Sequence, residues 1–314
     1  DLSFRTVMIE QLDNNLKLKS IVQSTYDRYI NDYNRYVIDS ELDKIPVTEI
    51  TAKQIRSFLE TKIINGISKK NFDNLIGLLN VVYFYSEMTD INVSNIKKLM
   101  KLKSKQFDKS NKRQTAEIAW TDEEQEKLIA YSRIHRDIRV LGMIFMLQTG
   151  LAISELTQLH KADVDIQSRE LTIKRIEIKY KKNGKTVYDV SQEDSAKTEN
   201  RLETMLLSQK AIQTYKDIIT LSKAKDDNDC IFNGYWSYNF NDYLRRHVLV
   251  DLDLSPRGLH SFRKTYATNL VDSGIEFKTI QEQMRHSDIQ TTMKFYYKSK
   301  STKKKKLETL DNVC

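Results

Sequence analysis

Apolar residues recur at helical spacing through the first hundred positions of the chain, from about Ser20 to Met100. Side chains repeated every three or four residues fall on one face of a helix, so the pattern predicts a series of amphipathic helices. Three such faces comprise Ile21, Tyr26, Tyr29 and Ile30; Ile55, Phe58, Leu59, Ile63 and Ile64; and Leu75, Leu78, Leu79, Val82 and Tyr83. We predict a small bundle of about four or five helices, with most of its aromatic residues in the core.

Turn and capping residues divide this helical region. The stretch 46–51 begins with Pro46 and ends with Thr51, which indicates a turn between two helices. A threonine side chain in that position can accept a hydrogen bond from the first turn of the helix that follows. We therefore expect a helix that begins after Thr51 and includes residues 54–61.

A second helical region begins near Ala116. Thr121 is followed three residues later by Glu124, which is the spacing of a capping box, and the acidic first turn suits the helix dipole. An apolar helix is predicted for residues 138–147, and another begins within 151–156.

Strand-like segments interrupt the helices of this second region. They are residues 170–173, 176–180, 185–190 and, after a second turn, part of 196–207. Asn183-Gly184 is a strong signal for a two-residue hairpin turn. Helices resume at Ser208, so the region is predicted to be mostly helical with one small antiparallel sheet.

Composition narrows the class of protein. The 314 residues are enough for two domains with a core in each. A net charge of +8 is compatible with an anionic partner but is weak evidence alone. Two cysteines, Cys230 and Cys314, form no disulfide framework or metal cluster, which fits a reducing cytoplasm. We see no apolar run near twenty residues and no signal peptide, so neither a membrane protein nor a secreted one is expected. A first residue of Asp1 rather than Met suggests a trimmed chain.

Basic residues concentrate between Lys97 and Arg113, where eight of them accompany a single acid, Asp108. Such a run is either a solvated linker or a strap that follows DNA phosphates with salt-sensitive affinity. The candidate DNA-binding residues are Lys97, Lys98, Lys101, Lys103, Lys105, Lys112 and Arg113.

Groups able to act on a phosphodiester gather in the last helical stretches. His260 and Arg263 stand three residues apart, and Tyr296 and Tyr297 follow His286 by ten and eleven. Any one of these residues alone is more often structural, and the joint pattern is what indicates an active site. The remaining histidines, His135, His160 and His247, are expected to be structural.

In order and spacing these segments resemble the boxes of the tyrosine recombinases of the phage-integrase family, and among them the integrases of integrative conjugative elements and conjugative transposons. Residues 260–268 resemble the H-x-x-R box, and residues 291–296 the nucleophile box. Residues 284–287 resemble the second-histidine box, although Arg285 stands where glycine is usual. Lys197 falls where the family has its hairpin lysine.

The resemblance implies a mainly α fold, a two-domain C-shaped DNA clamp in which a helical bundle joins a mixed helical catalytic domain with a small antiparallel sheet. The expected parts are a core-binding domain at 1–100, a basic linker at 101–117, a catalytic domain at 118–300 and a basic tail at 301–314. The implied partners are double-stranded DNA recombination sites and further copies of the chain, as a dimer or tetramer on DNA, with no membrane. No cofactor or metal is expected, and the expected location is the bacterial cytoplasm, at the nucleoid.

One box departs from the family pattern. Residues 149–156 resemble the family's T-G-x-R-x-x-E-L segment, but Ala152 replaces its arginine. In the family that arginine is one of two phosphate clamps, so the chain is expected to be impaired in cleavage. Either the substitution was introduced or the arginine was lost naturally. An introduced change is favoured because the other catalytic positions look intact.

The resemblance also implies a role for each site residue. Tyr296 would be the nucleophile that forms a 3′-phosphotyrosine, with Tyr297, or a tyrosine lost at Phe295, as the alternatives. Arg263 would clamp the phosphate and Lys197 would be the general acid. The supporting assignments are His260 as general acid/base, His286 as a donor to the phosphate and Glu155 as the group that orients the site.

Two other functions remain open on the sequence. A regulator descended from a recombinase would bind DNA without cutting it, and a type IB topoisomerase would share the chemistry without the need for paired sites. The target sequence, the choice among integration, excision and resolution, and the presence of an upstream arm-binding domain do not follow from these residues.

Overall fold

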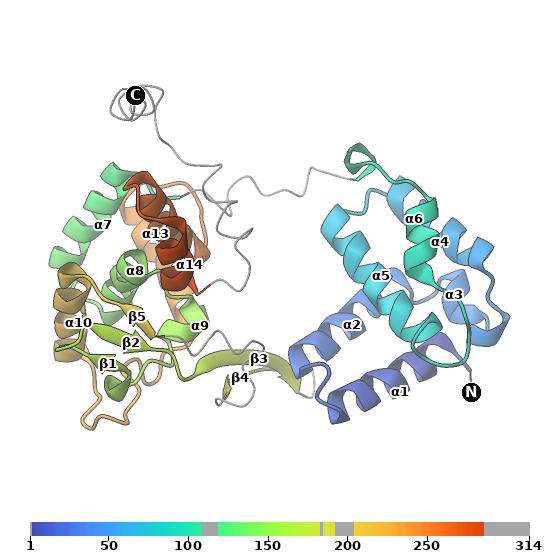
Figure 1. Cartoon of the computed structure of the whole chain (residues 1–314), viewed down its shortest axis with the longest axis horizontal. Helices are drawn as coiled ribbons and strands as arrows, with labels where there is room; N and C mark the ends of the chain where they lie inside the picture. Colours follow the sequence, from blue (N-terminus) through green and yellow to red (C-terminus); the bar gives the residue numbers. More distant parts are fainter. Residues whose placement is uncertain (1, 108–118, 183–184, 192–203, 286–314) are drawn as a thin grey trace. The chain divides into compact units, whose positions relative to one another are not determined.

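The computed structural model describes residues 2–107, 119–182, 185–191 and 204–285 (Figure 1). The chain divides into two compact units: residues 1–113 with 179–187, and residues 114–178 with 188–314. Across the described residues, no helix is both long enough and apolar enough to cross a membrane.

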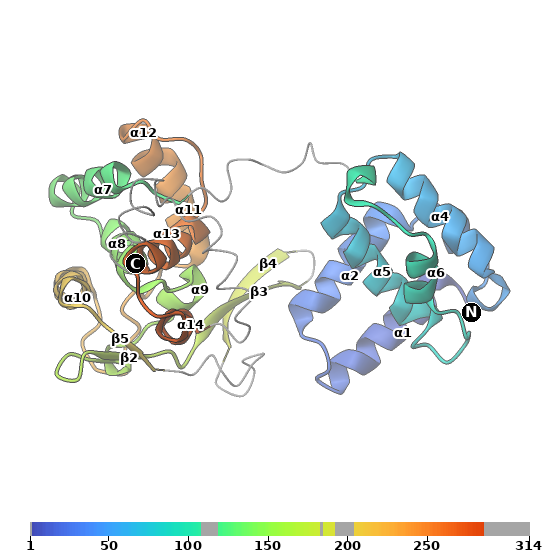
Figure 2. The ribbon, with the colours of Figure 1, turned by 45° about the horizontal axis from the view of Figure 1, so that its top comes forward.

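The first unit is a helical bundle around α5. Its helices are α1 (Phe4–Lys17), α2 (Gln23–Tyr36), α3 (Glu41–Lys44), α4 (Ala52–Ile64), α5 (Lys69–Tyr83) and α6 (Val93–Leu99), with short 3₁₀ turns at Val47–Glu49 and Ser104–Gln106. Helices α1, α2 and α6 pack on α5 (Figures 1 and 2). The bundle predicted from apolar spacing is therefore present.

Local signals account for where several of these helices begin. Thr51 caps α4 in a complete capping box with Gln54, as its position predicted. The side chains of Ser3, Ser68 and Asn92 each accept one backbone N–H at the start of α1, α5 and α6. Sequence reasoning missed α1, whose buried face consists of Phe4, Val7, Met8 and Leu12. This face ends in the polar run Asp13-Asn14-Asn15, so its apolar repeat is short.

The core of the first unit is apolar and aromatic. Phe4 stacks on Tyr33 with ring centres 5.9 Å apart and meets the edge of Tyr83 at 5.7 Å. All five predicted core positions on α5 are buried. Ile64 is the exception to the predicted faces: it is the last residue of α4 and is 83% exposed.

The second unit is built around α8 (Ile138–Thr149), whose side chains are nearly all buried. Helices α10 (Gln209–Leu221) and α13 (His260–Asp272) pack on it, and α7 (Asp122–Ile134) precedes it. The shorter elements are α9 (Ile153–Leu156), a 3₁₀ turn at Lys161–Asp163, α11 (Ser237–Tyr243), η6 (Leu244–Val248), α12 (Leu249–Asp251) and α14 (Phe277–Met284). The predicted capping box of Thr121 and Glu124 is present at the start of α7.

Two antiparallel ladders lie among the described residues, where the sequence predicted one sheet. Strands β1 (Val164–Asp165), β2 (Glu170–Thr172) and β5 (Thr204–Leu206) form the first, with Leu171 opposite both Val164 and Met205. Strands β3 (Ile176–Lys182) and β4 (Lys185–Ser191) form the second. The residues between β2 and β3 separate the two ladders. The turn at 183–184 lies outside the described residues.

Trp120 fixes the start of the second unit against α13. Its backbone N–H donates to Thr265 Oγ1 and its indole N–H to Ser261 Oγ, both at 2.8 Å. Its buried ring stacks on Phe262, with ring centres 4.8 Å apart. The Arg257 guanidinium carbon lies over the Trp120 ring, 4.8 Å from its centre. These contacts hold the helix that carries two of the predicted catalytic residues.

Candidate active site

The corner between α8 and α9 places position 152. Helix α8 ends at Thr149 and is capped by Gly150, which has φ 69° and ψ 14°, a conformation that favours glycine. A Cβ atom at Gly150 would lie 2.4 Å from Cδ1 of Tyr266, so α13 approaches the corner only because this side chain is absent. The chain then turns into α9, with Ala152 as its N-cap residue.

Glu155 is the buried acid of this corner. Its Oε2 accepts a hydrogen bond from the backbone N–H of Ala152 at 2.8 Å, which fixes the first turn of α9. The same oxygen accepts from Arg285 Nη2 at 2.7 Å and lies 3.7 Å from Arg263 Nη1. One carboxylate oxygen thus connects position 152 with two guanidinium groups.

Arg263 joins three elements around that carboxylate. It lies on α13 and its side chain is 11% exposed. Nη1 donates to the carbonyl of Gly150 at 2.7 Å, and Nη2 donates to the carbonyl of Met284, the last residue of α14. His260 stands one turn earlier on α13 and is exposed. The two residues predicted to act together are therefore on one helix, next to the 150–155 corner.

Arg285 is the residue of this cluster whose role sequence reasoning missed. It is the C-cap residue that follows α14, with a left-handed conformation of φ 52° and ψ 46°, and its side chain is 1% exposed. Nη1 reaches Met205 Sδ at 3.0 Å and the carbonyl of Gln283 at 3.4 Å. Within the described residues, its Nε has no hydrogen-bond partner. The only signal in the sequence was the replacement of a glycine that the family usually has there.

The positive charges of Arg263 and Arg285 affect the pKa of the neighbouring Tyr266 side chain. Burial raises the pKa of Tyr266, while the cations of Arg285 and Arg263 act in the opposite direction. Two guanidinium groups share one carboxylate here, so the cluster of Arg263, Arg285 and Glu155 carries a net positive charge, which suits a phosphate group.

Other predicted site residues lie outside the described part of the chain. These are Lys197, His286 and the candidate nucleophiles Tyr296, Tyr297 and Phe295. Their roles remain predictions. The described residues bring together Arg263, Glu155 and position 152.

The basic run predicted to contact DNA is described in part. Lys98, Lys101, Lys103 and Lys105 are exposed, at and beyond the end of α6. Lys97 is different, because its amine lies 2.7 Å from a carboxylate oxygen of Asp73, which Lys69 also contacts at 2.7 Å. Lys112 and Arg113 lie outside the described residues.

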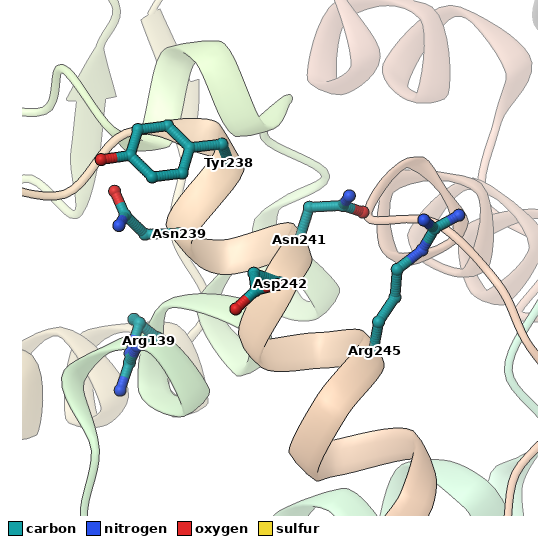
Figure 3. Close-up of a pocket in the computed structure, with 6 residues that line it drawn as sticks. All are labelled: Arg139, Tyr238, Asn239, Asn241, Asp242 and Arg245. Carbon is teal, nitrogen blue, oxygen red and sulfur yellow. The ribbon is translucent and has the colours of Figure 1, made fainter.

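A polar pocket on α11 is a further feature that sequence reasoning did not single out (Figure 3). Its volume is about 420 Å³, and it is lined by Arg139, Tyr238, Asn239, Asn241, Asp242 and Arg245. The side chains of Asn241 and Arg245 extend to the same side of the helix (Figure 3). Amide and guanidinium groups of this kind can pair with phosphates or with base edges.

Comparisons with known proteins agree with the motifs. A family model described as the phage integrase family matches residues 119–303. A tyrosine recombinase XerC-like protein of Caldanaerobacter subterraneus subsp. tengcongensis is 25% identical over 300 residues, which cover 87% of this chain and 73% of that protein. The transposase from transposon Tn916 of Enterococcus faecalis is 24% identical over 196 residues, which cover 56% of this chain and 46% of that protein.

Solved structures show the same fold. The Tn1549 transposon integrase in complex with a circular intermediate DNA matches with a TM-score of 0.71 and 16% identity over 100% of both chains. A lambda integrase tetramer bound to a Holliday junction matches with a TM-score of 0.56 and 17% identity over 91% of this chain and 76% of that one. At these identities the likeness establishes the mainly helical two-domain fold that the sequence predicted.

Proposed function

The chain belongs to the phage integrase family, and from that premise we propose that it is a site-specific DNA recombinase that cuts and rejoins DNA through a 3′-phosphotyrosine. The observation that carries the proposal is the Arg263 guanidinium, which is held between the carbonyls of Gly150 and Met284 beside the Glu155 carboxylate. A planar, fixed guanidinium matches the non-bridging oxygens of a phosphate, where charge develops during transfer.

The chemical step follows from the residue types. The Tyr296 oxygen attacks the scissile phosphorus, the bond from phosphorus to the 5′ oxygen breaks, and the protein gains a 3′-phosphotyrosine. A phenol has an unperturbed pKa of about 10, so it must pass its proton to a base, a role we give to His260. Lys197 gives a proton to the departing 5′ oxygen. Arg263 and His286 donate hydrogen bonds to the phosphate, and attack by the 5′ hydroxyl reverses the step.

Ala152 bears directly on the rate of this step. An arginine in that place would begin at the N-cap of α9, two residues beyond the carbonyl that Arg263 contacts. Without its guanidinium, the developing charge has one fewer donor, and the loss of one such donor typically costs about 10²–10³ in rate. We therefore propose a recombinase that is slowed at cleavage rather than one that works by other chemistry.

A suicide substrate tests the proposal. A duplex nicked beside the scissile phosphate loses a short fragment after cleavage, so the covalent adduct accumulates. The Ala152→Arg variant is expected to form the adduct faster than the chain with alanine, and peptide mapping is expected to find the adduct on Tyr296. Tyr296→Phe should abolish the adduct, whereas Tyr297→Phe should leave it.

The same experiment decides between the competing functions. If the Ala152→Arg variant binds DNA but never forms an adduct, the chain is a non-cutting regulator. If it relaxes single plasmids without recombining paired sites, it is a topoisomerase.

Assembly on DNA is part of the proposal. We propose that the chain acts on double-stranded recombination sites as a dimer or tetramer in the bacterial cytoplasm, and its relatives in the comparisons are bacterial recombinases. The basic tail at 301–314, which lies outside the described residues, would dock on a neighbouring copy. Deleting the tail should reduce the pairing of two sites more than the binding of one, and equal losses would contradict this role.

A further inference from the structure

We propose that Arg285 supplies a second phosphate-binding guanidinium to the active site, which makes up part, but not all, of the loss of the arginine absent at position 152. The inference rests on the proposed recombinase function, because it assigns a group to the phosphate of that reaction. It makes Arg285 a catalytic residue of this chain, carried by a different element from the one that carries position 152.

The first support is the position of the guanidinium. Glu155 Oε2 accepts from the backbone N–H of Ala152 at 2.8 Å and from Arg285 Nη2 at 2.7 Å. A guanidinium from the end of α14 therefore lies beside the point where the side chain of residue 152 begins. Arg263 contacts both sides of this arrangement, through the carbonyls of Gly150 and Met284.

The second support is the incomplete bonding of Arg285. Within the described residues, its buried Nε has no hydrogen-bond partner. Among the described residues, its Nη1 has only a thioether sulfur at 3.0 Å and a carbonyl at 3.4 Å as partners. Sulfur is a weak acceptor, and a buried cation normally has its donors satisfied. The side chain thus keeps hydrogen-bonding capacity that an oxyanion could use.

The third support is charge. One acid, Glu155, faces the guanidinium groups of both Arg263 and Arg285, so the trio carries a net positive charge. A phosphate that enters between the two guanidinium groups would bring the missing negative charge. For this contact, Arg285 Nη1 must exchange the sulfur of Met205 for a phosphate oxygen.

The backbone conformation of Arg285 is a fourth support for the proposal. Its φ of 52° lies in the left-handed region, which glycine adopts without cost and which is unfavourable for a residue with a Cβ atom. Among the non-glycine residues with positive φ that the structure describes, Arg285 is the only buried one, which makes it a candidate for a role at the site. The unfavourable φ also makes Arg285→Gly a useful variant, because glycine relieves the backbone while it removes the guanidinium.

Relocation of the arginine is the main test. We compare four chains on the nicked duplex: the parent, Arg285→Gly, Ala152→Arg with Arg285→Gly, and Arg285→Lys. The parent is expected to form the adduct, and Arg285→Gly to form it roughly 10²-fold more slowly, the usual loss for one donor. The double variant should recover the rate, because it returns one guanidinium to the other side of Glu155. Lysine keeps the charge without the two-pronged geometry, so it should fall in between.

A substrate with a neutral phosphate analogue can show whether Arg285 contacts the scissile phosphate or only supports the fold. A methylphosphonate at the scissile position removes the charge that the second guanidinium would balance. The defect of Arg285→Gly relative to the parent should shrink on this substrate. A purely structural role for Arg285 predicts the same defect on both substrates, together with a lower melting temperature, and that result would overturn the inference.

The outcomes distinguish failure of the role proposed for Arg285 from failure of the recombinase function on which it rests. If the double variant forms the adduct and Arg285→Gly does so as fast as the parent, the recombinase function stands and the role of Arg285 is wrong. If neither the double variant nor Ala152→Arg forms an adduct on DNA that it binds, the recombinase function itself fails, and the inference fails with it.

Discussion

The two compact units differ in the charge that they bury. Among the described residues, the first unit has a single charged residue with a buried side chain, Asp32. The described part of the second unit has six: Glu155, Asp163, Glu177, Arg257, Lys264 and Arg285. In the first unit, most charges lie on the surface over an apolar core. In the second, charges form part of the interior.

Several buried charges of the second unit are paired with an opposite charge. Arg257 donates to both oxygens of Glu124, at 2.8 and 2.6 Å. Arg175 lies 3.0 Å from Asp163. Pairs of this kind add little net stability, because desolvation cancels most of the attraction, but they hold groups in fixed positions. The difference suggests a division of labour in which one unit presents charge to a surface and the other preorganises charge for chemistry.

The largest expected effect comes from removing the acid at the centre of the second unit. Glu155→Ala leaves two guanidinium groups without their carboxylate and should cost about 3–5 kcal/mol of unfolding free energy. The matched change in the first unit is Asp73→Ala, which removes the partner of Lys69 and Lys97. That side chain is 42% exposed, so the loss should stay below about 1 kcal/mol. Urea unfolding measures both, and equal losses would remove the contrast between the units.

Glycine substitutions give the next largest contrast. Gly150→Ala meets the Tyr266 ring and a positive φ, and it should destabilise the second unit by about 1–3 kcal/mol. Gly77 lies in α5 of the first unit, where a Cβ would make an ordinary contact with Tyr29 at 3.4 Å. Gly77→Ala should be neutral or stabilise by up to about 1 kcal/mol, through helix propensity. Thermal melts with hydrogen exchange assign each change to its unit.

Mild acid should lower the stability of the second unit more than that of the first. Burial, and then the Arg175 cation, lower the pKa of His160 below its usual 6.5. The folded chain therefore binds fewer protons than the unfolded chain, so stability present above pH 6.5 is lost as the pH falls through that value and on to the folded pKa. The five histidines are His135, His160, His247, His260 and His286, and the first unit has none of them.

Hydrogen exchange between pH 7.5 and 6 can locate this loss. Weaker protection is expected in the second unit alone, and His160→Gln should flatten its pH dependence. An equal loss in the first unit would contradict the assignment to His160.

The smallest expected effect concerns single surface lysines. Lys98→Ala removes one exposed charge and should lower the salt slope of DNA binding by about 0.9 if that amine meets a phosphate. Lys97→Ala should change it less, because the Lys97 amine is already paired with Asp73. Titrations of binding at several salt concentrations measure the slopes. Identical slopes for both variants would mean that the Asp73 pair does not compete with DNA.

Local signals in the sequence predicted most of the elements. The threonine caps of α4 and α7, the strand-like runs and the apolar face of α5 all act over a few residues, so they can be recognised without the fold. The family resemblance predicted that Arg263 and Glu155 act together, and the structure places Arg263 Nη1 3.7 Å from Glu155 Oε2. The missing helix α1 and the exposed Ile64 show the limit of apolar spacing at the ends of elements.

Contacts between residues far apart in the sequence could not be predicted in the same way. Arg285 follows Glu155 by 130 positions, and only the fold brings their side chains to 2.7 Å. Its left-handed backbone also has no signature when the residue is not glycine. The approach of Tyr266 to Gly150 is of the same kind, since the glycine signals a helix end but not what packs against it.

The anchoring of Trp120 has a mechanical consequence for the chain. Its two hydrogen bonds end on Ser261 and Thr265, on either side of Arg263 along the same helix. A pull on the polypeptide as it enters the second unit would therefore act directly on the helix that bears this arginine. Tension in the preceding segment and alignment of the guanidinium would be coupled without any intermediate element.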